Sequence, residues 1–221
     1  MNEAVTGEDW TVILPVKPFS LGKSRLAPDA AAHRAALARC FYLDTLHAVL
    51  STTQVSRVIV VTGDADAAAL ASGGQATVVR DDPGRGLNQA VAQGVAHARS
   101  LDADCAVAVV TADLPCLRAA ELSRVLSAAH GHRRAFLADH TGWGTTVLTA
   151  GRGQELRPAF EGRSRGRHLR DGAVELRLRD VFSVRLDVDT VEDLRTAAAL
   201  GVGPRTARLL ADISDWHPKV A

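Results

Sequence analysis

Blocks of apolar and polar residues alternate along the first 130 residues in a way that predicts strands and helices in turn. Short, β-branched apolar runs predict buried strands, and longer segments with apolar residues every three or four positions predict helices with one buried face. The expected strands are 11–16, 57–61, 76–79 and 106–110. The expected helices begin near Asp29, begin again after Asp64, and cover 87–101 and about 118–130.

Beyond residue 130 the pattern changes. We expect strands at 134–138, 145–149, 174–178 and 184–186, and helices at 191–200 and 204–212. Strand–helix alternation favours an α/β fold with a mostly parallel sheet and right-handed crossovers, to which the later strands add a small antiparallel extension. We therefore expect one domain over 10–212, a disordered N-terminal tail at 1–9 and a C-terminal tail at 213–221.

The composition mainly excludes classes of protein. The 221 residues are 47% hydrophobic, but no apolar run approaches the roughly 18 residues of a membrane span. The polar, acidic N-terminus argues against a secretory signal, and three cysteines without CxxC spacing argue against a disulfide scaffold or a zinc site. A formal net charge of +1 gives no electrostatic case for binding nucleic acid. A cytoplasmic protein without membrane or nucleic-acid partners is expected.

Cations follow the first expected strand. Ligands of open α/β sheets bind beyond the carboxyl ends of the strands, and Lys17, Lys23 and Arg25 occupy that place after strand 11–16. Lysine is rare in this chain, with only Lys219 besides these two. Lysine and arginine both bind phosphate, although the glycine pattern of a classical P-loop is absent. A solvated connector explains the segment equally well.

Carboxylates follow the later strands. Asp113 follows strand 106–110. Asp187 and Asp189 follow strand 184–186, and their side chains point the same way if the strand continues. Mg²⁺ takes one or two carboxylates together with phosphate oxygens, so these residues are candidate metal ligands. The alternative is helix capping, by Asp113 before helix 118–130 and by Asp189 or Thr190 before helix 191–200.

Two further segments carry candidate binding groups. Asn88 lies in the first turn of an expected helix after a glycine-rich loop, where free backbone N–H groups favour an anion and the amide can read a base or ribose; capping is the alternative. Glycines, hydroxyls and arginines at 142–146 and in a basic loop at 160–168 suit a small phosphorylated acid, or are simply exposed. The eight histidines form no HxH or HExxH motif, and no GxSxG elbow is present, which excludes zinc-protease and α/β-hydrolase signatures.

Taken together, these segments resemble the guanylyltransferases of coenzyme F-420 biosynthesis over about residues 10–212. The shared motifs are Ile13-Leu-Pro-Val-Lys-Pro18, Lys23-Ser-Arg-Leu26, Gly86-Leu-Asn88, Asp113-Leu-Pro115, Gly142-x-Gly-Thr145, Asp187-Val-Asp-Thr190 and Leu200-Gly-Val-Gly203. The resemblance implies a three-layer, Rossmann-like nucleotidyltransferase fold related to nucleotide-diphospho-sugar transferases. It also implies GTP as co-substrate, Mg²⁺ as cofactor, and phosphoenolpyruvate or 2-phospho-L-lactate as the small acid that receives GMP.

Site residues carry over by position. Asp113, Asp187 and Asp189 match the expected metal ligands, and Thr145 and Ser164 match residues that hold phosphoenolpyruvate. Glu161 is the third candidate for binding the acid by position, but it is a departure, because the family usually has glycine there, unless Gly162 takes that role. A carboxylate at this place repels an anionic acid.

In the mechanism that the resemblance implies, a phosphate oxygen of the acid attacks the α-phosphorus of GTP. Lys17, Lys23 and Arg25 would hold the triphosphate, Asn88 would contact the nucleotide, and no catalytic histidine is needed because the phosphate is already ionised. Arginine in place of lysine is typical of GC-rich genomes and so hints at an actinobacterial source. The resemblance implies phosphoenolpyruvate as the acid of actinobacterial members and 2-phospho-L-lactate as the acid of archaeal-type members, so this residue usage favours phosphoenolpyruvate. Cytidylyl or uridylyl transfer and a catalytically silent GTP-binding regulatory subunit are the alternatives. The sequence does not specify the oligomeric state.

Overall fold

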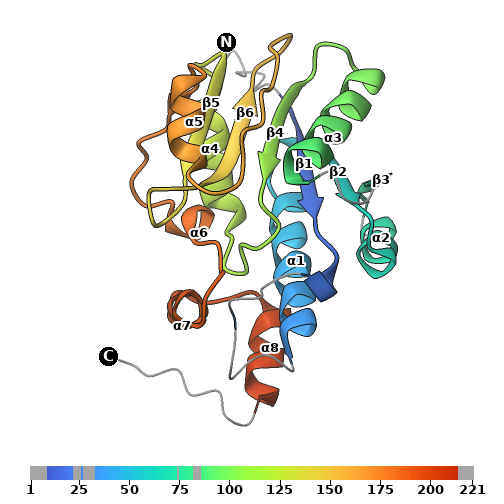
Figure 1. The fold of residues 1–221 in the computed structure, drawn as a ribbon, viewed down its shortest axis with the longest axis vertical. Coiled ribbons are helices and arrows are strands. Elements are labelled where there is room, and N and C mark those ends of the chain that lie inside the picture. The colour runs from blue at the N-terminus through green and yellow to red at the C-terminus, as the bar shows by residue number, and fades with distance from the viewer. Residues whose placement is uncertain (1–8, 22–25, 27–32, 74, 82–85, 214–221) are drawn as a thin grey trace, which may run out of the picture.

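A single seven-stranded sheet, in the order β3-β2-β1-β4-β6-β5-β7, forms the centre of the protein in a computed structural model that describes residues 9–21, 26, 33–73, 75–81 and 86–213 (Figure 1). The strands are β1 (Trp10–Val16), β2 (Val55–Thr62), β3 (Thr77–Arg80), β4 (Ala106–Val110), β5 (Arg134–Ala138), β6 (Thr145–Ala150) and β7 (Val174–Glu175). The helices are η1 (Phe19–Leu21), α1 (Arg34–Leu50), α2 (Ala65–Ser72), α3 (Leu87–Leu101), α4 (Ala119–Ala129), α5 (Ser164–Arg170), α6 (Phe182–Arg185), α7 (Val191–Leu200) and α8 (Pro204–Asp212).

Strand direction matters for the site. Strands β1 to β4 are parallel, β6 is antiparallel to both β4 and β5, and β7 is parallel to β5. Consequently β6 begins at the sheet edge where its neighbours β4 and β5 end. The expected α/β fold with a mostly parallel sheet is confirmed.

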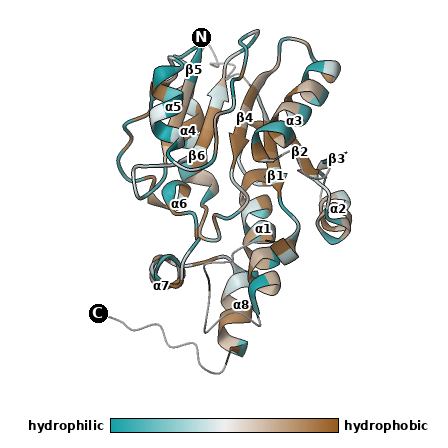
Figure 2. Cartoon of the chain, viewed as in Figure 1, coloured by the Kyte–Doolittle hydropathy of each residue, from teal (hydrophilic) through white to brown (hydrophobic). Residues whose placement is uncertain are grey.

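Helices cover both faces of the sheet, because the central strands are apolar on both faces (Figure 2). Every residue of β1 and of β4 is buried. Val12 and Leu14 pack in one core with α1, α2 and α4, whereas Ile13 packs in the other core with α3. A third core joins α1 to α7 and α8, which lie beyond the end of the sheet (Figure 1).

Close packing accounts for the glycine in the middle of α3. A Cβ on Gly94 would lie 2.6 Å from Cγ2 of Ile13 and 2.8 Å from Cγ2 of Val61. The helix therefore approaches β1 and β2 more closely than any larger residue would permit.

Three expectations for the second half of the chain are wrong. Residues 184–186 form no strand, since the short helix α6 covers most of them, and the strand expected at 174–178 is limited to Val174–Glu175. The basic segment at 160–168 contains the start of α5 rather than only a loop. A short apolar run does not distinguish a strand from a buried helical turn, and here Ser183 hydrogen-bonds Glu121 on α4 and holds the turn in place.

Several expectations lie outside the described residues. They are the helix start near Asp29 and most of both tails, 1–9 and 213–221, in which only Asp9 and Ile213 are described. None of the helices within the described ranges is long and apolar enough to span a membrane.

Candidate active site

Lys17 and Asp113 leave the same edge of the sheet from neighbouring parallel strands. Ile13 of β1 is paired with Val109 of β4, and each of the two charged residues follows its paired residue by four positions. Lys17 is exposed, as a cation that meets a soluble anion must be. Lys23 and Arg25, the other two cations expected here, lie outside the described residues.

Backbone hydrogen bonds bring the Asp113 segment against the Asp187 segment. The N–H of Val188 donates to the carbonyl of Asp113 at 3.1 Å, and the N–H of Gly203 donates to the carbonyl of Pro115 at 2.7 Å. A Cβ on Gly203 would lie 2.4 Å from Cγ of Asp44. Gly203 of the Leu200-Gly-Val-Gly203 motif therefore contributes to the site indirectly, because only glycine allows this loop to approach both Pro115 and Asp44.

The three expected metal ligands lie on adjoining segments, and the charges of Asp113 and Asp189 act on the carboxyl of Asp187. The pKa of Asp187 is raised to about 6, first by burial and further by the charges of Asp113, Asp189 and Asp139. Oxygen ligands whose mutual repulsion a cation would relieve are chemically suited to Mg²⁺. Within the described ranges, no three acidic, histidine or cysteine side chains form a ready-made metal cluster. Mg²⁺ in proteins commonly takes one or two carboxylates together with substrate phosphate oxygens and waters.

The capping alternatives for these aspartates are resolved by the helix starts. Thr190 caps α7, and its hydroxyl and the carboxylate of Asp193 form a reciprocal capping box. The N-cap of α4 is Arg118, so Asp113 is not the cap of that helix.

His140 is a site residue that the sequence analysis missed. Its Nδ1 lies 3.3 Å from Oδ1 of Asp187, and its Nε2 lies 3.2 Å from Oδ1 of Asp193. The hydrogen bond to Asp187 is the main cause that raises the pKa of His140 to about 8. His140 follows β5, so the strand-end rule that identified Asp113 would also have identified it.

The turn before β6 is organised by Asp139. Its carboxylate accepts hydrogen bonds from the N–H groups of Trp143, at 3.0 Å, and Gly144, at 2.8 Å, and from the hydroxyl of Thr141. The turn delivers Thr145 to the first position of β6, at the same sheet edge as the carboxylates.

Thr145 and Ser164, the two residues expected to bind the acid, are brought together by β6 and α5. Ser164 Oγ lies 3.0 Å from Thr145 Oγ1, and both residues are buried. His168, one helical turn beyond Ser164, places its Nδ1 3.0 Å from the same Thr145 oxygen. Burial is the main cause that lowers the pKa of His168 to about 4, so the ring is neutral.

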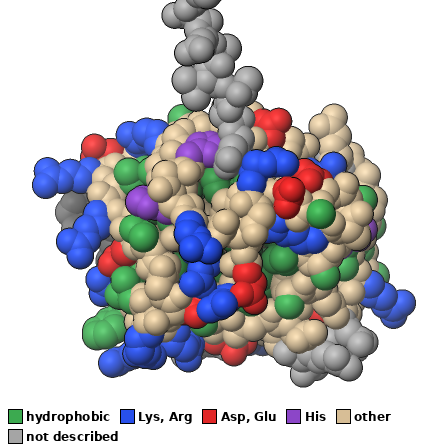
Figure 3. Space-filling view, turned by 90° about the horizontal axis from the view of Figure 1, so that it is seen from above, with side chains coloured by type: hydrophobic (Ala, Val, Ile, Leu, Met, Phe, Trp, Pro, Cys, Tyr) green, Lys and Arg blue, Asp and Glu red, His purple; other side chains and the backbone are tan. Residues whose placement is uncertain are grey.

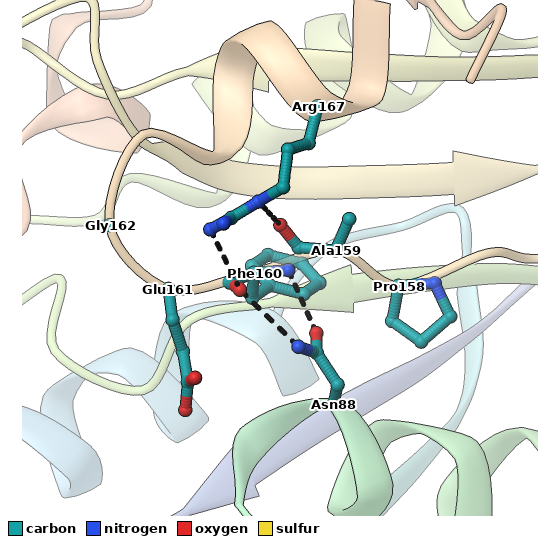
Figure 4. Close-up of a pocket in the computed structure, with 7 residues that line it drawn as sticks. All are labelled: Asn88, Pro158, Ala159, Phe160, Glu161, Gly162 and Arg167. Atoms are coloured by element: carbon teal, nitrogen blue, oxygen red, sulfur yellow. Dashed lines mark hydrogen bonds between the residues drawn. The ribbon is translucent and has the colours of Figure 1, made fainter. Parts of the chain in front are cut away.

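Beside this network lies a pocket of about 410 Å³, lined by Asn88, Pro158, Ala159, Phe160, Glu161, Gly162 and Arg167 (Figure 4). Asn88 accepts from the N–H of Phe160 at 2.8 Å and donates to its carbonyl at 3.3 Å. Arg167, from α5 above the pocket, donates to the carbonyls of Ala159 and Phe160. Asn88 thus ties α3 to the segment that leads into the acid site, a role that the sequence did not indicate.

Glu161 has a left-handed backbone, with φ of 80°. Such a conformation costs a non-glycine residue about 1–2 kcal/mol, whereas glycine adopts it without that cost. Its Oε1 lies 3.7 Å from the position that a Cβ on Gly86 would take, and Gly86 is the N-cap of α3. A negative charge therefore stands at this helix start, next to the pocket.

A second hollow, of about 270 Å³, contains Arg133, Arg134 and Arg157. Each of these arginines is engaged: Arg134 with Asp171, Arg157 with Glu155, and Arg133 with Gln154. The face of the molecule seen from above likewise carries acidic side chains among its basic ones (Figure 3). The arginines of this second hollow are therefore engaged with neighbouring side chains of the protein.

The chain is similar to known proteins over most of its length. The chain is 53% identical over 203 residues to the phosphoenolpyruvate guanylyltransferase of Streptomyces coelicolor, covering 91% of this chain and 96% of that protein. It is 47% identical over 209 residues to the protein of the same name from Thermomonospora curvata, covering 95% and 92%.

Solved structures share the fold. A protein described as a candidate nucleotide-diphospho-sugar transferase from Desulfovibrio desulfuricans aligns with a TM-score of 0.69 at 16% identity, covering 93% of this chain and 96% of that one. A nucleotidyl transferase from Methanothermobacter thermautotroptrophicus aligns with a TM-score of 0.62 at 23% identity, covering 88% and 98%. The family model described as "Guanylyl transferase CofC like" matches residues 10–214. The chain therefore belongs to the CofC-like guanylyl transferase family.

Proposed function

We propose that this enzyme transfers GMP from GTP to phosphoenolpyruvate and releases pyrophosphate, as a step of coenzyme F-420 biosynthesis. The observation that carries the proposal is the buried Thr145–Ser164 hydroxyl pair, which lies at the sheet edge that also presents Asp113 and Asp187. The hydroxyls can donate to an oxygen of a small phosphorylated acid, and the nearby carboxylates can hold the Mg²⁺ of a nucleoside triphosphate. The relatives named for phosphoenolpyruvate support this acid over 2-phospho-L-lactate.

The chemistry requires positioning and charge neutralisation rather than proton transfer. An oxygen of the acid's phosphate forms a bond to the α-phosphorus of GTP, and the bond from that phosphorus to the β-phosphate oxygen breaks. The attacking oxygen is already ionised near neutral pH, so no general base is needed. When bound, Mg²⁺ offsets charge on the leaving pyrophosphate, and Asp113, Asp187 and Asp189 would hold it.

The cations have a separate task in this proposal. Lys17 would bind triphosphate oxygens from the end of β1, together with Lys23 and Arg25. Asn88 would contribute through the segment it holds, by keeping Phe160 in place beside the acid-binding hydroxyls.

A competition assay tests the proposal. Pyrophosphate release is measured with GTP, CTP or UTP and with phosphoenolpyruvate or 2-phospho-L-lactate, and the product formed from GTP with both acids together is identified by mass. We expect the enolpyruvyl product and a strong preference for GTP. Equal turnover with CTP, a phospholactate product, or tight GTP binding without pyrophosphate release would each contradict the proposal.

A further inference from the structure

His168 is buried beside the acid-binding pair although the proposed chemistry uses no histidine. The residue is only 1% exposed, and its ring packs against the rings of Phe136 and Phe160, with centroids 5.6 and 5.3 Å away. Both ring nitrogens nevertheless have polar partners: Nδ1 faces Thr145 Oγ1 at 3.0 Å, and Nε2 faces the N–H of Ala159 at 3.1 Å. A buried neutral ring with a polar partner at each nitrogen is held in one tautomer.

The hydrogen bond at Nε2 decides which nitrogen carries the proton. A backbone N–H can only donate, so Nε2 of His168 accepts from Ala159 and bears no hydrogen. The single proton of the neutral ring is therefore on Nδ1. His168 donates this proton to the oxygen of Thr145.

The direction of that bond determines what the hydroxyl pair offers to a ligand. Thr145 and Ser164 have two hydroxyl hydrogens, and one lies between their oxygens. Because His168 donates to Thr145, the second hydrogen is left to donate elsewhere. With the opposite tautomer, Thr145 would donate to His168 and Ser164 to Thr145, and the pair would present only lone pairs, which repel an anion.

We propose that His168 is a positioning residue: by donating from Nδ1 to Thr145, it keeps one hydroxyl hydrogen of the Thr145–Ser164 pair directed at an oxygen of the acidic substrate. This inference rests on the proposed function, in which that pair binds the acid. His168 does not touch substrate itself and acts only through the polarity of the hydrogen bonds.

Two conservative substitutions separate this role from a merely structural one. The amide nitrogen of asparagine can occupy the place of Nδ1, so His168→Asn retains a donor to Thr145 but loses the acceptor for Ala159. The amide oxygen of glutamine can occupy the place of Nε2, so His168→Gln retains the acceptor and loses the donor. We expect His168→Asn to keep the KM for the acid within about threefold of the wild type while lowering the Tm, and His168→Gln to raise that KM by about 10- to 100-fold with a smaller loss of Tm. The KM for GTP serves as the internal control and should change little in either variant.

A merely structural histidine would produce a different pattern. The KM for the acid would then follow the Tm, and His168→Asn would be the more impaired variant, which would overturn the inference. The tautomer is tested independently of any substrate by a long-range ¹H–¹⁵N NMR spectrum of the wild-type imidazole rings. A proton on Nε2 of His168 would overturn the positioning role whatever acid the enzyme uses. Lack of turnover with phosphoenolpyruvate would contradict the proposed function alone, and the comparison of variants would then be made with the acid that the wild type accepts.

Discussion

The carboxylate of Asp139 fills the space that a side chain on Gly144 would need. Its Oδ2 accepts the N–H of Gly144 at 2.8 Å and would lie only 2.4 Å from a Cβ on that residue. The glycine is therefore required by this contact rather than by backbone flexibility. The contact fixes the turn that places Thr145 at the start of β6.

Replacing Gly144 should disturb the acid side of the site and spare the nucleotide side. We expect Gly144→Ala to lower the free energy of unfolding by about 1–3 kcal/mol, because the Cβ displaces the half-buried Asp139 carboxylate, which accepts several hydrogen bonds. The KM for the acid should rise more than the KM for GTP. Gly131→Ala is the matched control, since a Cβ there meets nothing within 4 Å. Equal effects of the two substitutions on the KM for the acid would contradict this account.

The left-handed backbone of Glu161 predicts a stabilising substitution. Glu161→Gly should raise the free energy of unfolding by about 0.5–1 kcal/mol, because relief of the φ of 80° outweighs the entropy of glycine in the unfolded chain. It should also lower the KM for the acid by removing a nearby negative charge. Glu161→Gln separates the two effects, since it removes the charge and keeps the strained backbone. If Glu161→Gln were stabilised as much as Glu161→Gly in chemical denaturation, strain would not be the cause.

Asp113 should matter for turnover far more than for folding. We expect Asp113→Asn to reduce kcat/KM by at least about 100-fold, the loss of roughly 3 kcal/mol of transition-state stabilisation, while the Tm changes little. Asp66→Asn is the control, because Asp66 is an exposed partner of Arg39 on α2, away from the site. A fully active Asp113→Asn enzyme would contradict the metal role of this carboxylate.

The buried, neutral state of His168 predicts a loss of stability in mild acid. Its pKa is lowered to about 4 from 6.5, chiefly by burial, with Arg167 adding to the lowering and Asp171 opposing it. As the pH falls through 6.5, the unfolded chain binds a proton at His168 that the folded chain does not bind. The contribution of neutral His168 to the free energy of unfolding is therefore fully present above pH 6.5 and is lost between pH 6.5 and pH 4. The full loss is at most about 3 kcal/mol.

Urea denaturation of the wild type and His168→Gln at a series of pH values between 7 and 4 measures this effect. We expect the wild type to lose more of its free energy of unfolding than the variant over this interval, because the variant has no group to protonate at residue 168. Parallel losses in the two proteins would show that other groups account for the acid sensitivity.

The sequence predicted those parts of the molecule that depend on local pattern. The apolar runs of β1 and β4 are recognisable because strands buried on both faces are continuously hydrophobic, and their shared direction places Lys17 and Asp113 at one edge. The sequence did not reveal that His168 serves Thr145, since that contact joins residues 23 positions apart through an irregular segment. The left-handed φ of Glu161 was equally hidden, because glutamate is not a residue that signals this conformation.

Because β6 runs antiparallel to β4 and β5, the groups proposed to bind the nucleotide and those proposed to bind the acid come from two different parts of the sheet. On one side, parallel strands β1 and β4 end in the charged groups proposed for the nucleotide; on the other, the β5–β6 hairpin and α5 supply the hydroxyls proposed for the acid. The two sets of contacts therefore come from separate stretches of chain. Substitutions in residues 143–168 can therefore change the acid-binding side while His140, which contacts Asp187, and the charged groups proposed for the nucleotide stay in place, and this segment is the one to exchange in a variant meant for a different phosphorylated acid.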